Sequence, residues 1–199
     1  MSSELVQLLK RRFLIANLIW VGMFLSIFVY TGLAYKLSLD LVDLPTLSLR
    51  ECFETPLAQL VSFASISMLG LHFFLPSFFW KSQTKSIPDS KDILASMRDQ
   101  RTTDGQKFWS EGDLLLAASL SEDELFCLWQ FPKWLIGFIF KLFMADLIAI
   151  SGLILSFQTN QFTCIFLFSG TALVLFLMSF PRASVYFEQC NDLKRTFNS

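Results

Sequence analysis

Four long apolar stretches limit what this chain can fold into. They run from about residues 13 to 35, 57 to 80, 133 to 157 and 162 to 180. The hydrocarbon core of a bilayer is about 30 Å thick, and about 20 apolar residues in an α-helix cross it. Lipid offers no hydrogen-bond partners to the backbone, whereas a helix pairs its backbone N–H and C=O groups internally. The pattern therefore predicts four transmembrane helices.

Composition points to the same class of protein. Hydrophobic residues make up 53% of the 199 residues, and 23 of the residues are Phe, which is outside the range of ordinary soluble domains. The formal net charge is −1, and no basic block resembles a nucleic-acid-binding arm. The first apolar stretch follows "KRR", as in a signal peptide, but it is too long and lacks a small-x-small cleavage site. We expect a retained signal anchor and no nucleic-acid partner.

The placement of Lys and Arg predicts the orientation in the membrane. Basic residues gather before the first stretch, after the second and after the fourth, whereas only Lys36 and Arg50 lie in the first connecting loop. Cytoplasmic loops carry an excess of Lys and Arg. We therefore expect a multi-pass protein of the cell membrane, the inner membrane in a bacterium, with both termini and the middle loop in the cytoplasm.

The predicted fold class is all-α, with four transmembrane helices arranged as two antiparallel hairpins in a four-helix bundle. Residues 1–80 form the first hairpin, with an outer loop at 36–56, and residues 132–199 form the second hairpin and a cytoplasmic tail. Residues 81–131 form a small helical insert in the cytoplasm. Leu alternates with polar residues in the outer loop, which favours a short strand or a segment lying on the surface.

Two short helices are expected in the insert. The first lies within "DILASMRDQRTTDGQK" and ends before Gly105. Ser121 and Glu124 have the spacing of a capping box, which predicts a second helix from Glu122 to Gln130. That helix should end at Pro132, which opens the third span.

Apolar residues of the insert allow two interpretations. They can form an interfacial helix-turn-helix that closes the cytoplasmic side of the bundle, or a docking platform for another membrane or cytoplasmic protein, because a run of Leu is unfavourable in water. The docking candidates are Leu114, Leu115, Leu116, Leu125, Leu128 and Trp129.

Polar groups inside the spans are the main candidates for a functional site. Asp146 lies about 18 Å from the cytoplasmic end of the third span by helix rise, and an ionised Asp there costs about 2.5–3.5 kcal/mol. It should therefore face the bundle interior and find a partner or be protonated, and we expect His72 or Ser67 of the second span to be the partner. Lys141 is close enough to the interface for its ammonium group to reach it.

Two roles for Asp146 remain open. A stripe of small residues beside it lets helix backbones approach closely, so that Asp146 can be a polar clasp within a packed helix pair. Alternatively, Asp146, His72 and Ser67 form a proton or cation site. The small residues are Ala145, Ala149, Gly152 and Ser156.

Catalytic and metal-binding patterns are missing from the sequence. It holds no phosphate-binding Gly loop, no CxxC, no G-x-S-x-G and a single His, so we expect neither an enzyme nor a cofactor or metal site. Cys52 and Cys164 both fall near the outer face, where a disulfide can form. Single Cys residues in spans are also common as small apolar fillers.

Residues of the third stretch resemble a known family. In "ADLIAISGLIL", Asp146 is followed by Ala149, Ile150, Gly152 and Leu153, an order similar to the ion-carrying helix of the proteolipid ring subunits of rotary ATPases. The resemblance implies that Asp146 binds a translocated proton or sodium ion. The third and fourth stretches, ending in "LFLMSFPRAS", also resemble the C-terminal half of uncharacterised small four-span bacterial membrane proteins, a resemblance that implies no activity.

Two functions follow as hypotheses. The first is a non-catalytic accessory or scaffold subunit, embedded in the lipid bilayer, whose cytoplasmic insert docks a partner protein. The second is a proton or cation conductor, or a small transporter, that uses Asp146 with His72.

Overall fold

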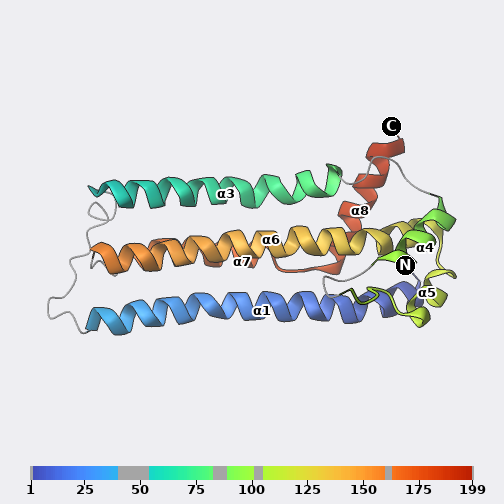
Figure 1. The fold of residues 1–199 in the computed structure, drawn as a ribbon, viewed down its shortest axis with the longest axis horizontal. Helices are drawn as coiled ribbons and strands as arrows, with labels where there is room; N and C mark the ends of the chain where they lie inside the picture. The colour runs from blue at the N-terminus through green and yellow to red at the C-terminus, as the bar shows by residue number, and fades with distance from the viewer. Residues whose placement is uncertain (1, 40–53, 83–88, 101–104, 160–162, 199) are drawn as a thin grey trace. The chain divides into compact units, whose positions relative to one another are not determined.

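The computed structural model describes residues 2–39, 54–82, 89–100, 105–159 and 163–198, and all regular elements in these ranges are helices (Figure 1). The all-α prediction is confirmed for this part of the chain. Most of the predicted outer loop lies outside the described residues. The helices are α1 (Ser3–Leu39), α3 (Pro56–Ser82), α4 (Ser90–Asp99), α5 (Glu111–Ala117), α6 (Glu122–Thr159), α7 (Thr163–Met178) and α8 (Ala183–Asn198).

Among these, α1, α3 and α6 are long and apolar enough to cross a membrane. The 37 residues of α1 and the 38 of α6 rise about 55 Å each, well beyond the roughly 30 Å of hydrocarbon. The 16 residues of α7 rise only about 24 Å. A fourth span results when α7 and α8, which meet at a bend of 71°, are taken together.

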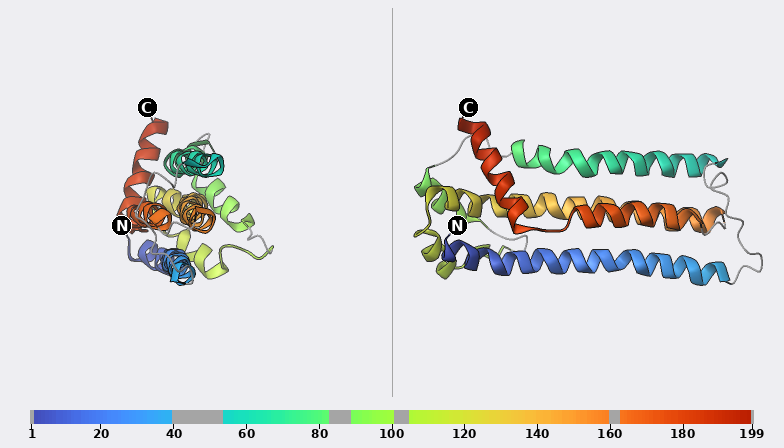
Figure 2. Two further views of the ribbon diagram at one scale, coloured as in Figure 1. Left: turned by 90° about the vertical axis from the view of Figure 1, so that its left-hand side faces the viewer. Right: turned by 180° about the vertical axis from the view of Figure 1, so that it is seen from behind.

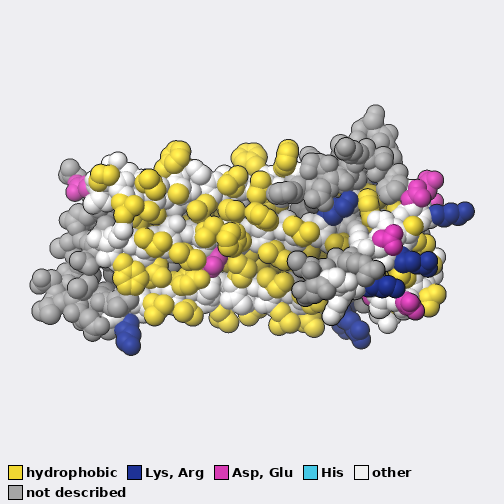
Figure 3. Space-filling model, in the orientation of Figure 1, with side chains coloured by type: hydrophobic (Ala, Val, Ile, Leu, Met, Phe, Trp, Pro, Cys, Tyr) yellow, Lys and Arg dark blue, Asp and Glu magenta, His cyan; other side chains and the backbone are white. Residues whose placement is uncertain are grey.

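The described helices form two compact units, and α1 and α6 contribute to both. Unit 1 holds residues 1–17, 79–136 and 181–199, and unit 2 holds residues 18–78 and 137–180. On the face shown in Figure 3, apolar side chains cover the helices of unit 2. Phe63 and Phe74 are more than 70% exposed there, as side chains that face lipid would be.

In unit 2, α1, α3, α6 and α7 run side by side (Figures 1 and 2). The small-residue stripe of α6 makes the contact with α7: a Cβ atom added at Gly152 would lie 2.5 Å from the Cβ of Phe168. Ala145 and Ala149 of the same stripe are fully buried. Small residues therefore bring these two helices together, as the spacing in the sequence predicts.

Aromatic side chains join α1 to α7 in unit 2. Trp20 stacks on Phe24 with ring centroids 4.8 Å apart, and its indole N–H donates to the carbonyl of Phe176 at 2.8 Å. That carbonyl lies in the last turn of α7 and also accepts from the Ser179 amide at 3.1 Å. The indole thus adds a second donor at the end of α7.

Unit 1 has its own hydrophobic core around four aromatic rings. Phe13 of α1 lies 5.3 Å from Phe131, 5.5 Å from Trp134 and 5.9 Å from Tyr186 between ring centroids. The Tyr186 hydroxyl is buried and donates to the carbonyl of Cys127, as a buried Tyr hydroxyl requires. These rings connect α1, α6 and α8 at one end of each helix.

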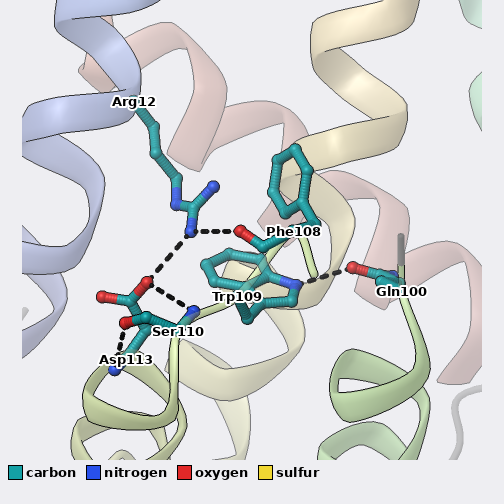
Figure 4. Close-up of polar contacts among 6 residues, drawn as sticks. All are labelled: Arg12, Gln100, Phe108, Trp109, Ser110 and Asp113. Carbon is teal, nitrogen blue, oxygen red and sulfur yellow. Dashed lines mark hydrogen bonds and ion pairs between the residues drawn. The ribbon is translucent and has the colours of Figure 1, made fainter. Parts of the chain in front are cut away.

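A polar cluster holds the insert on α1 within unit 1 (Figure 4). The Arg12 guanidinium donates to the Phe108 carbonyl at 3.2 Å and to an Asp113 carboxylate oxygen at 3.3 Å. It also lies over the ring of Trp109, 3.8 Å from the centroid, in cation–π geometry. The buried Trp109 donates to Gln100 at 2.6 Å.

The predicted break at Pro132 is wrong, because α6 runs unbroken from Glu122 through this residue. Proline removes one backbone donor from a helix. The flanking Leu128 and Phe131 are fully buried in the core of unit 1, and their packing stabilises the helix across this position.

The capping box predicted at residue 121 is half present. The Ser121 hydroxyl accepts from the Glu124 amide at 3.4 Å, whereas the Glu124 carboxylate accepts from the amide of Ser2. A complete box forms instead at the start of α5, between Ser110 and Asp113. The Ser-x-x-Asp spacing of residues 110–113 is the local signal for this box.

Candidate functional site

Asp146 is a half-buried carboxylate in the middle of α6, and its described partners lie on α1. Its Oδ1 atom is 2.5 Å from the Ser26 hydroxyl, and its Oδ2 atom is 3.3 Å from the Tyr30 hydroxyl. Ser26 and Tyr30 are four residues apart, so they lie on one face of α1. We call these three residues the Asp146 cluster.

The Ser26 hydroxyl has two acceptors within reach. It lies 2.5 Å from the carbonyl of Met23 as well as from Asp146 Oδ1. A hydroxyl has one proton, so it donates to only one of them at a time.

The surroundings of the cluster are apolar. Ile27, between the two hydroxyl residues on α1, is buried, and so are Ala145 and Ala149 on α6. Figure 3 shows an acidic side chain among apolar ones on the face of unit 2 that it presents. An ionised carboxylate is costly in such surroundings, and hydroxyl donors reduce that cost.

His72 belongs to a separate polar contact. Its ring is 2% exposed, with Nδ1 2.9 Å from the Lys141 carbonyl and Nε2 3.3 Å from the Ser179 hydroxyl. A carbonyl only accepts, so Nδ1 carries a proton and donates to it. These contacts join α3, α6 and the residue after α7.

The predicted contact of Asp146 with His72 or Ser67 is not found among the described residues. Ser67 is exposed, and its hydroxyl donates to the carbonyl of Phe63 in its own helix at 2.9 Å. Asp146 turns to α1 rather than to α3. The signal that could have identified its partners is the spacing of Ser26 and Tyr30, two polar residues one turn apart in the first apolar stretch.

Most of the docking candidates are used inside unit 1. Leu125 and Leu128 are buried in its core, and Leu114, Leu116 and Trp129 pack against that core. Leu115 alone among the six candidates is exposed, at 76%. Packing within unit 1 accounts for the other five.

Cys164 is buried and disulfide-bonded. Cys52, its predicted partner, lies outside the described residues, so the pairing stays a prediction. Cys127 and Cys190 are free thiols, both buried in unit 1, and burial raises the pKa of the Cys190 thiol. Within the described ranges, no three His, Cys, Asp or Glu residues are placed to hold a metal ion.

Comparisons with known proteins add no family to this geometry. No family model, no curated protein and no solved structure matches the chain. The resemblances to proteolipid ring subunits and to four-span bacterial proteins therefore stay predictions, and function has to be argued from the contacts themselves.

Proposed function

We propose that the chain is a non-catalytic accessory or scaffold subunit of a membrane assembly. It crosses the membrane four times as two antiparallel hairpins, with both termini and the insert in the cytoplasm. Support comes from the three apolar helices and the bent α7 and α8 pair, from the exposed Phe side chains of unit 2, and from the distribution of Lys and Arg.

The observation that carries this proposal is how unit 2 uses its polar side chains. Several of its described contacts join two helices: Asp146 bonds to α1, Thr31 of α1 lies 3.3 Å from Ser169 of α7, and His72 of α3 bonds to the Lys141 carbonyl of α6. Interhelical hydrogen bonds in membranes contribute about 0.6 kcal/mol each on average. Such interhelical hydrogen bonds fix the positions of the helices, and this role requires no catalysed reaction and no transported ion.

The insert is the proposed site for a partner protein, with Leu115 at its centre. A deletion of residues 110–130 would remove the buried Leu125 and Leu128 and unfold unit 1, so a point substitution is the better test. Purification in mild detergent should retain the partner with the wild-type chain and lose it with Leu115→Ser. Retention of that partner by Leu115→Ser would exclude the docking role.

A proton or cation conductor is the second candidate, and the Asp146 cluster favours it. Support for it comes from Ser26 and Tyr30, whose hydroxyls bond to the Asp146 carboxylate in place of the expected His72. Asn has the shape of Asp and still accepts hydrogen bonds, but it does not titrate. Asp146→Asn should therefore leave a scaffold intact and abolish conduction.

Proteoliposomes with a pH-sensitive dye separate these two functions. The scaffold proposal expects no proton flux beyond that of empty liposomes, and unchanged partner retention in Asp146→Asn. Ser67→Ala is the control, because the described bond of that hydroxyl lies within its own helix. Proton flux that disappears in Asp146→Asn and persists in Ser67→Ala would overturn the scaffold proposal in favour of the conductor.

A further inference from the structure

An open groove of about 590 Å³ lies in unit 1 between the N-terminal part of α1 and the start of α8. Phe13 and Leu14 of α1 and Phe187 of α8 form much of its apolar wall. The volume is within the roughly 300–1,000 Å³ typical of small-ligand sites.

Two basic side chains also line the groove. Lys10 and Arg11 are exposed, and the described residues provide neither with an ion pair. Arg12, the third basic residue of the "KRR" run, is committed to Asp113 and Phe108. The groove thus presents two available positive charges beside an apolar wall.

The position of the groove matches the edge of a membrane. Lys10 and Arg11 directly precede the first apolar stretch, which begins at Phe13. Basic residues at this place lie at the level of lipid headgroups, where the cytoplasmic leaflet carries anionic lipids. Asn17 is also part of the wall.

We propose that this groove binds an anionic phospholipid of the cytoplasmic leaflet. One acyl chain lies against Phe13, Leu14 and Phe187, and the phosphate pairs with Lys10 and Arg11. Affinity then comes from apolar burial and selectivity from charge. The inference rests on the proposed membrane embedding, with the N-terminus in the cytoplasm.

Native mass spectrometry tests the inference. The full chain is released from detergent that contains equal amounts of phosphatidylglycerol and phosphatidylcholine. The wild type should retain phosphatidylglycerol in preference to phosphatidylcholine. Lys10→Gln with Arg11→Gln should reduce that preference about 30-fold, because each basic side chain beside an anionic group contributes roughly a factor of five. Ala183→Phe, a change at an exposed position in the wall, should lower the retention of both lipids by filling the groove.

The matched control is Lys91→Gln with Arg98→Gln on α4, which removes one Lys and one Arg from exposed positions of the same unit away from the groove. This control variant should keep the preference for phosphatidylglycerol. An equal loss in both double variants, no preference in the wild type, or unchanged lipid retention in Ala183→Phe would each overturn the inference. An alkaline carbonate wash tests the embedding separately: a chain that is released contradicts the proposed function, whereas a chain that stays in the membrane without lipid preference contradicts only the groove.

Discussion

The carboxylate of Asp146 on α6 lies 2.5 Å from the hydroxyl of Ser26 on α1. This contact links the first apolar stretch of the sequence to the third, and Tyr30 adds a second hydroxyl from the next turn of α1. A carboxylate in an apolar environment is stable only when donors face it. The contact is therefore a polar link between two helices.

Removal of the Ser26 hydroxyl should destabilise unit 2 more than removal of the Tyr30 hydroxyl. Ser26→Ala takes the close donor from Asp146 Oδ1 and should lower the free energy of unfolding by about 1–2 kcal/mol. Tyr30→Phe breaks a 3.3 Å contact and should cost about 0.5 kcal/mol. Thermal unfolding in mild detergent measures both, with Ser67→Ala as the control expected to change little. An equal loss in all three variants would contradict the clasp.

Gly152 should not tolerate a side chain, because a Cβ atom there would lie 2.5 Å from that of Phe168. Gly152→Ala must push α6 and α7 apart and should cost about 1–3 kcal/mol, as overpacking does. Gly170→Ala on α7 is the matched control, since nothing lies within 4 Å of its added Cβ. Helix propensity favours Ala over Gly by about 1 kcal/mol, so this control should unfold at the same or a higher temperature.

The helical class and the small-residue contact could be predicted because both depend on local spacing. A run of apolar residues is sufficient to predict a helix in lipid, and Gly152 with Ala145 and Ala149 marks a packing face on one helix alone. The choice of neighbour is different. The sequence places His72 and Asp146 at similar depth, but it cannot tell which helix each faces, and the structure separates them.

Tertiary packing also decides whether the apolar side chains of the insert are buried or exposed. Leu125 and Leu128 look like a docking surface when the segment is considered alone, because nothing in it can cover them. In unit 1, the N-terminal part of α1 and the start of α8 supply the missing neighbours, including Phe13 and Tyr186. These segments are far apart in the sequence, so local patterns do not predict this core.

The thiol of Cys190 should react with maleimide only after unfolding. It is buried in unit 1, and burial raises its pKa. The thiolate is the reactive form, and a raised pKa keeps it scarce until the pH passes well above the ordinary value of a thiol. We expect no labelling of Cys190 at pH 7 to 9 in the folded protein and complete labelling in denaturant, measured by mass spectrometry. Rapid labelling under native conditions would show that unit 1 is open.

A disulfide between Cys52 and Cys164 should change mobility on a non-reducing gel. Cys52→Ser and Cys164→Ser should both migrate differently from the wild type without reductant and identically with it. Loss of a disulfide that closes a loop of this length also costs about 2–4 kcal/mol. Cys127→Ser is the control, because that thiol is free. A Cys52→Ser variant that migrates like the wild type would end the prediction.

Arg12 should resist replacement even by Lys. Its guanidinium reaches the Phe108 carbonyl and the Asp113 carboxylate at the same time, and it lies flat over Trp109. An ammonium group keeps the charge but loses the planar fork and the stacking. Arg12→Lys should therefore destabilise unit 1 by about 1–2 kcal/mol, and the neighbouring Arg11→Lys, which has no such partners, should leave stability unchanged. Tryptophan fluorescence, to which the buried Trp109 contributes, measures the loss of stability on unfolding. An equal change of stability in the two variants would mean that charge alone holds the insert on α1.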